Sequence, residues 1–294
     1  MSNKENTLRL PTWFRESKGK RKATINLAKQ LEAEVPNSIC QEAKCPNRSE
    51  CFNKGVLTFM ILGTICTRNC AFCSVSHGKP LPPSKNEITP ILNAIQKLNL
   101  RFVVLTSPNR DELKDGGSAH YAYCIQEIKK NYPSVKVEVL IPDFQGDTQA
   151  LDTIISAQPD VINHNMETVP SLYRIARRGS LFQRSLNVLS YVKKQAPHIL
   201  SKSGLMVGLG EEREELIETF QHIRKSQVDI LTLGQYLKPS KDNLDVKKYY
   251  TPKEFKDLQI HAEKLGFPFV FSGPLVRSSY LADHVFEKTS PLHV

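Results

Sequence analysis

Short apolar runs alternate with amphipathic stretches along most of the chain. The apolar runs have the length of buried strands, whereas the amphipathic stretches repeat their apolar residues at helical spacing. Strict alternation of strand and helix implies parallel strands joined by right-handed crossovers. The expected strands are 57–63, 101–107, 135–142, 160–165, 204–210, 228–234 and 267–273. The expected helices are 87–99, 119–132, 147–157, 180–196, 211–225 and 251–266.

This order of elements predicts an α/β fold, a partial (β/α)6-type barrel of the TIM-like kind, open or closed, with N- and C-terminal extensions. A doubly wound sheet is the competing arrangement. The barrel is expected over residues 55–272, between an N-terminal extension (1–54) and a C-terminal segment (273–294). In a parallel barrel the carboxyl ends of the strands form the rim where chemistry takes place.

Three cysteines with the spacing C-x3-C-x2-C directly follow the first expected strand, and therefore belong to that rim. They are Cys66, Cys70 and Cys73. Crowded thiolates suit soft metals, chiefly zinc and iron–sulfur clusters. A structural zinc completed by His77 is one alternative. The other is an iron–sulfur cluster with one position left open.

A second set of three cysteines precedes the barrel with the spacing C-x4-C-x5-C, at Cys40, Cys45 and Cys51. It also lacks an obvious fourth ligand in its own segment. Two such sets fit two 4Fe–4S clusters, each with one iron not held by cysteine, better than two closed zinc sites. The rival hypothesis is a zinc protein that binds nucleic acid through its basic N-terminal arm.

Composition narrows the class of protein. The chain has 294 residues, 40% of them hydrophobic and 24% charged, which is ordinary for a globular enzyme. The longest uncharged apolar run is too short to span a bilayer, and neither a secretory nor a transit signal is evident at the N-terminus. We therefore expect a cytoplasmic protein with no membrane partner.

The formal net charge is +10, and bases gather at Lys18, Lys20, Arg21 and Lys22. This arm is either a solvated segment or a patch that steers an acidic partner. No aromatic–basic interleaving or binding motif supports nucleic acid.

Longer motifs extend the pattern of the cysteines. The stretch "CQEAKCPNRSECFNKGVLTFMILGTICTRNCAFCSVSHGKP" is followed in order by "TSPNRDELKDGG", "HNMETVPSLYRIARRG", "GLMVGLGE", "LGQYLKPS" and "GPLVRSSY". From about Pro11 to Tyr280, the chain resembles the radical S-adenosylmethionine superfamily and, within it, the lipoyl synthase family.

The resemblance implies insertion of two sulfur atoms at C6 and C8 of a protein-bound octanoyl group. These carbons are unactivated, so a cofactor-borne radical must abstract hydrogen. It implies two 4Fe–4S clusters and S-adenosylmethionine, which would chelate the open iron of the Cys66–Cys70–Cys73 cluster. The Cys40–Cys45–Cys51 cluster would take Ser279 of "RSSY" as its fourth ligand and donate the sulfur. A different sulfur-inserting or methylthiolating enzyme is the alternative, and the C-x4-C-x5-C spacing with "RSSY" argues against it.

The remaining expected contacts belong to S-adenosylmethionine. Phe72 is expected near the adenine, Thr106 and Ser107 near the amino group, and a strand-end pair near the ribose or sulfonium. That pair is Asn165 and Glu167. Arg178 is expected to pair with the carboxylate of S-adenosylmethionine. At Gly208 the backbone is expected to come close to the ligand.

The expected partners are octanoylated carrier domains, either of the E2 component of 2-oxoacid dehydrogenases or the H protein of glycine cleavage. An electron donor such as flavodoxin or ferredoxin and a cluster-repair carrier are also expected. We expect the chain to be a monomer that binds no nucleic acid.

Overall fold

Seven parallel strands form one sheet in the computed structural model, which describes residues 8–14 and 56–279. The order of the strands in the sheet follows their order in the chain, and every neighbouring pair is parallel. A doubly wound sheet would reverse its order at a switch point, so the partial barrel is confirmed. The strands are β1 (Val56–Met60), β4 (Phe102–Thr106), β5 (Lys136–Leu140), β6 (Val161–Asn163), β7 (Leu200–Val207), β8 (Ile230–Gln235) and β9 (Phe269–Gly273).

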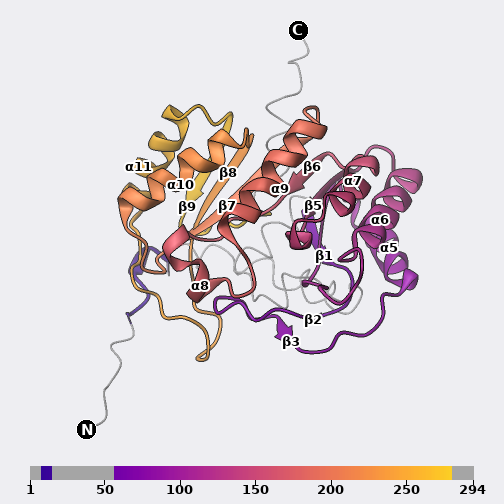
Figure 1. The fold of residues 1–294 in the computed structure, drawn as a ribbon, viewed down its shortest axis with the longest axis horizontal. Coiled ribbons are helices and arrows are strands. Elements are labelled where there is room, and N and C mark those ends of the chain that lie inside the picture. The colour runs from indigo at the N-terminus through magenta and orange to yellow at the C-terminus, as the bar shows by residue number, and fades with distance from the viewer. Residues whose placement is uncertain (1–7, 15–55, 280–294) are drawn as a thin grey trace.

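Helices follow each of the first six strands and lie along the outside of the curved sheet, from α5 at one end to α11 at the other (Figure 1). The barrel is open, because β1 and β9 are the two ends of the sheet. The helices are α5 (Ile88–Leu98), α6 (Ser118–Asn131), α7 (Thr148–Ser156), α8 (Tyr173–Ala176), α9 (Phe182–Gln195), α10 (Arg213–Lys225) and α11 (Pro252–Lys264). Short 3-10 turns are η2 (Lys85–Glu87), η3 (Phe144–Gly146) and η4 (Pro170–Leu172).

Alternate residues of the strands point to the two faces of the sheet. On the outer face, residues such as Val103 and Leu105 pack with the helices in large apolar clusters. On the inner face, Val104 belongs to a smaller cluster that contains strand residues only. That inner cluster comprises Val56, Phe102, Val104, Val161 and Ile230.

A buried polar group stands on the inner face above this cluster. The Nζ atom of Lys202 is 3.0 and 3.1 Å from the two carboxylate oxygens of Glu138, and Asn163 Nδ2 donates to the same carboxylate at 3.1 Å. All three side chains are buried, so each charge depends on its partner. Two residues further along the same strands, the inner positions line the cavity described below.

The first strand is shorter than the sequence pattern predicts. It ends at Met60, and Leu62 and Gly63 turn out of the sheet with φ of 65° and 82°. Their N–H groups donate to the Glu87 carboxylate at 2.8 and 3.0 Å rather than to a strand. The chain then enters the cysteine loop, which carries the small parallel pair β2 (Ile65–Cys66) and β3 (Ser76–His77).

Local signals explain two of the helices well. In α10, Glu214 and Glu215 occupy the first turn and bases occupy the last, as the sequence predicts from the helix dipole. In α11, Thr251 and Glu254 form a reciprocal capping box, worth about 1 kcal/mol. Among the described residues, no helix is long and apolar enough to cross a membrane.

Candidate active site

A cavity of about 340 Å³ opens at the carboxyl ends of the strands. It brings together residues that are far apart in the chain and that the sequence analysis selected. They are Cys66, Cys70, Phe72, Cys73, Thr106, Ser107, Asn165 and Glu167. They converge because parallel strands place their carboxyl ends at one rim.

The cysteine loop presents its sulfurs to this cavity. Cys66 is buried, and Cys70 and Cys73 are partly exposed to the cavity. Two backbone N–H groups, of Arg68 and Asn109, donate to the Cys66 sulfur at 3.3 Å each. These two donors fix the position of the Cys66 sulfur at the rim.

The electrostatics of the thiols call for a cation. Burial raises the pKa of Cys70 to about 12 and that of Cys73 to about 11, and the neighbouring thiols add to the effect. Three thiolates side by side are therefore costly unless a metal neutralises them. In the part of the chain that the structure describes, no cysteine, histidine or acidic group is already arranged as a metal site. The donor set of three thiols fits an iron–sulfur cluster.

Arg68, between the first two cysteines, ties this loop to the ends of three strands. Its guanidinium makes a bidentate ion pair with Asp111 (2.6 and 2.7 Å), which follows β4. It also pairs with Asp143 after β5 (2.7 Å) and donates to Ser180 after β6 (3.0 Å). Both Arg68 and Asp143 are buried. The loop is thereby fixed relative to the barrel.

The middle of the loop is held from both sides. The N–H of Ala71 donates to Ala176 O of α8 at 2.9 Å. The carbonyl of Ala71 accepts from Leu244 N at 3.0 Å and from Asn243 Nδ2 at 3.2 Å. Asn243 also donates to Cys73 O at 2.8 Å. The loop thus lies between α8 and the segment that follows β8.

Opposite the sulfurs, the cavity carries a negative and a positive group. Burial raises the pKa of Glu167, against the opposing charge of Arg177 and a 3.1 Å hydrogen bond from Asn165. Arg177 is buried, and its Nη1 donates to the hydroxyls of Tyr173 and Ser185 at 3.0 Å each. Because the two charges are separate, they suit a ligand that has both a cationic and an anionic group.

A buried polar atom of Asn165 also fits a bound ligand. Asn165 Oδ1 is buried and has no hydrogen-bond partner among the described residues. Beside it, Gly204 of β7 lines the cavity and lets Asn165 and Thr232 pack closely, because a Cβ there would lie only 2.8 Å from that oxygen and 2.7 Å from Thr232 Oγ1. A glycine inside a strand often marks such a close approach. An unsatisfied acceptor on a residue that lines the cavity indicates a site for a donor group of a ligand.

Comparison with known proteins is decisive for the family. The model of the radical SAM superfamily matches residues 60–223. Lipoyl synthase of Shewanella loihica is 48% identical over 284 residues, covering 96% of this chain and 88% of that protein. Lipoyl synthase of Shewanella denitrificans is 49% identical over the same shares. The chain belongs to the lipoyl synthase family.

As a member of the lipoyl synthase family, the chain is a radical S-adenosylmethionine sulfurtransferase with two 4Fe–4S clusters. Solved structures of other proteins share its fold. Methylornithine synthase gives a TM-score of 0.55 at 15% identity, covering 78% of this chain and 76% of that one. SuiB of Streptococcus suis bound to S-adenosylmethionine gives 0.58 at 11% identity, covering 76% and 53%. At such identities the likeness concerns the fold alone.

Two residues expected in the lipoyl synthase site lie elsewhere. Arg178 is exposed and does not line the cavity, whereas its neighbour Arg177 does, so Arg177 replaces it as the candidate for the carboxylate. Gly208 also lies outside the cavity. With φ of 101°, it packs against Gln235 and the Lys248 backbone, and its N–H donates to Glu211 at 2.6 Å. Gly204, unlike Gly208, lines the cavity.

His77 does not join the sulfurs. Its backbone pairs with Cys66 across β2 and β3, but its side chain is exposed and does not line the cavity. This geometry disfavours the alternative of a zinc site completed by His77.

Residues of the C-terminal motif also line this cavity. Val276, Arg277 and Ser278 line it, and Arg277 Nη1 donates to Gln235 O at 2.7 Å. Ser279, the expected cluster ligand, is partly buried and adjoins these residues without lining the cavity. The expected auxiliary ligands Cys40, Cys45 and Cys51 lie outside the described residues, as does the basic arm.

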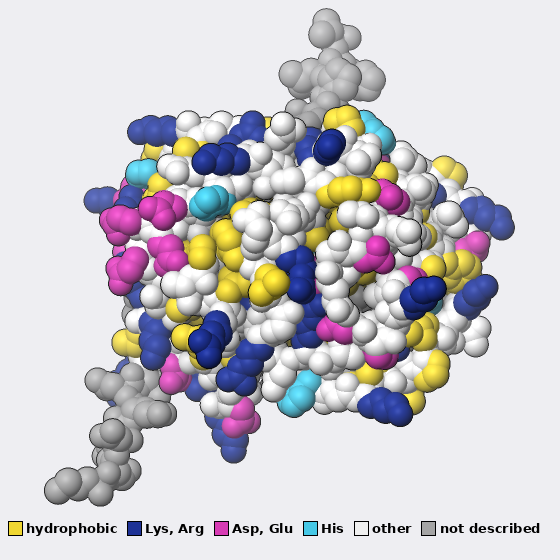
Figure 2. All heavy atoms as spheres, in the orientation of Figure 1, with side chains coloured by type: hydrophobic (Ala, Val, Ile, Leu, Met, Phe, Trp, Pro, Cys, Tyr) yellow, Lys and Arg dark blue, Asp and Glu magenta, His cyan; other side chains and the backbone are white. Residues whose placement is uncertain are grey.

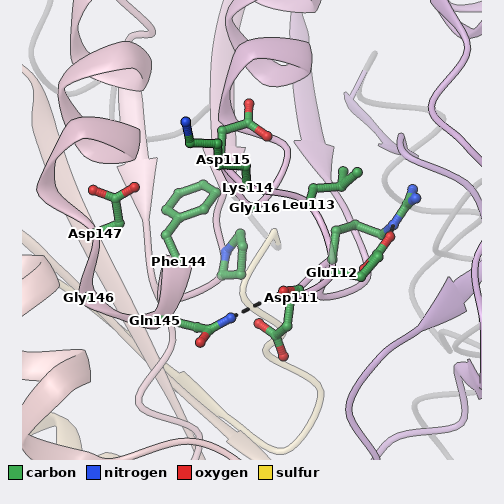
Figure 3. A pocket seen from close by; sticks show the side chains of 12 residues that line it. Asp111, Glu112, Leu113, Lys114, Asp115, Gly116, Phe144, Gln145, Gly146 and Asp147 are labelled. Atoms are coloured by element: carbon green, nitrogen blue, oxygen red, sulfur yellow. Dashed lines mark hydrogen bonds and ion pairs between the residues drawn. The ribbon is translucent and has the colours of Figure 1, made fainter.

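A second cavity, of about 460 Å³, lies over the loops that follow β4 and β5 (Figure 3). Its carboxylates are engaged locally: Asp115 accepts from Ala119 N at 2.9 Å, and Asp147 accepts from Gln149 N at 2.9 Å. In Figure 3 the Gln145 side chain points to the Asp111 backbone, 3.4 Å away. These groups cap helices and loops, so the cysteine cavity remains the candidate active site.

Proposed function

We propose that the chain converts a protein-bound octanoyl group to a lipoyl group by inserting sulfur at C6 and C8, at the cysteine cavity. The observation that carries the proposal is the meeting of three thiols with Glu167 and Arg177 at one barrel rim. The family relationship, at 48% identity over nearly the whole chain, supports the same reaction.

When bound, the clusters supply an electron and sulfur, and S-adenosylmethionine supplies the radical that removes hydrogen from unactivated carbons. Cys66, Cys70 and Cys73 would hold the radical cluster, with its fourth iron open to the amino-acid end of S-adenosylmethionine. Cys40, Cys45, Cys51 and Ser279 would hold the auxiliary cluster that donates sulfur.

The other residues bind and orient. Arg177 would pair with the carboxylate of S-adenosylmethionine, because it is a buried cation of the cavity, whereas the other one, Arg68, is already paired with Asp111 and Asp143. Glu167 faces the positive sulfonium and amino groups, and the free oxygen of Asn165 accepts from the ribose. Thr106 and Ser107 contact the amino end.

The apolar part of the lining completes the site. Phe72 packs on the adenine, and Met60, Leu140 and Leu237 exclude water from the cavity, which protects a radical from side reactions.

The chain acts on lipoyl-carrier proteins. We propose, in addition, which carrier domains, electron donor and cluster carrier it works with. The substrates are octanoylated carrier domains of 2-oxoacid dehydrogenase E2 or H protein. Flavodoxin or ferredoxin reduces the clusters, and a cluster carrier rebuilds the auxiliary one. The protein works in the cytoplasm as a monomer.

The test is mass spectrometry of an octanoyl-lysine peptide incubated anaerobically with the cluster-loaded enzyme, reductant and S-adenosylmethionine. The expected product replaces two hydrogens of the octanoyl chain with two sulfurs. The Cys66→Ala variant is the negative control. An unmodified octanoyl peptide, recovered with the unaltered enzyme carrying about eight irons, would contradict the proposal.

A further inference from the structure

The segment between β6 and α9 carries a basic and apolar surface beside the active-site cavity. Residues 170–184 contain four arginines and no aspartate or glutamate. On their outer side, Arg174 and Arg178 are exposed, and so are Ile175 (53%) and Leu181 (58%). We call these four residues the α8 surface.

The burial of its side chains separates an inner and an outer side of this segment. Tyr173 and Arg177, four residues apart, point inward, and Tyr173 packs edge-on against Phe182 with ring centroids 5.3 Å apart. Arg174 and Arg178, also four residues apart, point outward. Figure 2 shows dark-blue and yellow side chains next to one another over α8 and the start of α9. The inner side therefore holds the segment in place and leaves the outer side available.

Exposed large apolar side chains are few in the described part of the chain: Leu8, Leu81, Ile175, Leu181 and Ile260. Two of them fall within this one short segment, next to exposed arginines. A single exposed leucine is normal, but exposed apolar side chains next to arginines are typical of a protein-binding surface.

The α8 surface lies on the outer side of a segment whose inner side lines the active-site cavity. Arg177 lines the cavity, and Ala176 O accepts from Ala71 N of the cysteine loop at 2.9 Å. Gly179, with φ of 82°, lies against the Arg68 side chain, because a Cβ there would be 3.4 Å from Arg68 Cδ. A partner seated on the α8 surface is therefore held beside the cysteine loop and the cavity.

We propose that the α8 surface docks the carrier domain that bears the octanoyl group, through an acidic surface with an apolar patch. The proposal rests on the proposed function, which requires a protein-bound substrate. Charge complementarity favours an acidic partner, because the segment contains arginines and no aspartate or glutamate. The net charge of the chain, +10, favours the same kind of partner. Ile175 and Leu181 favour a protein over a nucleic acid, because phosphates offer them no apolar contact.

The experiment compares two substrates of the cluster-loaded enzyme: an intact octanoylated carrier domain and a short octanoyl-lysine peptide. Arg174→Glu should lower kcat/KM for the domain about fivefold at low salt, because one attraction becomes a repulsion. The double change Ile175→Ser/Leu181→Ser should lower it roughly tenfold. Neither should change kcat/KM for the peptide, which is too small to reach the α8 surface from the cavity.

Matched controls come from the same chain. Arg101→Glu reverses an exposed charge before β4, at the opposite end of the barrel, and Ile260→Ser removes an apolar side chain of α11 that is 37% exposed. Both should leave the two substrates unaffected. Losses as large in the controls as in the α8 variants would mean that net charge or surface polarity acts generally, and would overturn the proposal.

Binding of the octanoylated domain, measured by titration, separates this proposal from the proposed function. If the unaltered enzyme makes no lipoyl product from either substrate, the function fails, whereas docking is supported when Arg174→Glu still weakens domain binding. Unchanged domain binding in both α8 variants overturns docking. So does an equal loss of activity on domain and peptide. Docking of the domain is also overturned if an α8 variant loses affinity for a DNA duplex but keeps its affinity for the domain.

Discussion

Replacing Arg68 by methionine removes the guanidinium charge that ties the cysteine loop to the barrel and keeps an unbranched side chain as far as the position of Nε. The buried partner most affected is Asp143. Burial raises the pKa of Asp143, but the hydrogen bond and charge of Arg68 outweigh it and lower the pKa from 3.8 to about 2. This gap is equivalent to roughly 2 kcal/mol at pH 7. The partly exposed pair with Asp111 adds up to about 1 kcal/mol.

The free energy of unfolding of Arg68→Met should therefore fall by about 3 kcal/mol. The assay is urea unfolding of the cluster-free protein at pH 7, followed by circular dichroism. Arg184→Met is the control, because Arg184 contacts the same carboxylate at only 3.3 Å and is more exposed. Its loss should stay below about 1 kcal/mol. An Arg68→Met protein as stable as the control would refute the reasoning.

The pH dependence gives a second check on Arg68. A carboxyl whose pKa is lowered in the folded state stabilises the protein above its unfolded pKa, and this stabilisation is lost as pH falls through the folded pKa. For Asp143 the window runs from about pH 4 to about pH 2. At pH 3, roughly half of the Asp143 contribution should remain. A difference between wild type and Arg68→Met that stays constant from pH 7 to pH 3 would contradict this assignment.

Three further predictions concern the cofactors. Cys70→Ala should abolish 5′-deoxyadenosine release under dithionite, because the reducing electron passes through that cluster; normal release would reject the assignment. Arg177→Gln should raise the KM for S-adenosylmethionine about 10- to 100-fold by removing a charged hydrogen bond, whereas Arg178→Gln should leave it unchanged; the reverse result would restore Arg178. Ser279→Ala should keep cleavage of S-adenosylmethionine but lose most sulfur insertion, measured by mass spectrometry. If it inserts sulfur normally and Ser278→Ala does not, Ser278 is the ligand.

The sequence predicts the barrel well because strand burial and helix amphipathicity are local patterns. Most of the cavity lining can be predicted from the same patterns, because they locate the ends of the strands. Thr106, Asn165 and Glu167 come at or just after the ends of strands that meet at one rim. What the pattern cannot supply is where a strand stops. Gly208 has the same parity along the chain as Gly204, but the strand ends at Val207, and the positive φ of Gly208 turns it away from the cavity.

The choice between Arg177 and Arg178 depends on a helix too short for periodicity to reveal. Tyr173 begins α8 and Arg177 directly follows its last residue, and the two side chains share the buried side. The apolar Tyr173 was therefore a signal that Arg177 points inward. It becomes readable only once residues 173–176 are known to be helical, because an extended chain would alternate the residues differently.

Arg68 shows the deeper limit of sequence reasoning. Its partners Asp111 and Asp143 stand 43 and 75 residues further along the chain, and Ser180 stands 112 residues away. No local pattern links them, yet each follows a different strand, so they meet only when three successive strands are in register. The pairing that positions the cysteine loop is therefore a product of the sheet itself. A disturbance of β4, β5 or β6 should consequently reach the cluster through Arg68, although none of these strands carries a cysteine.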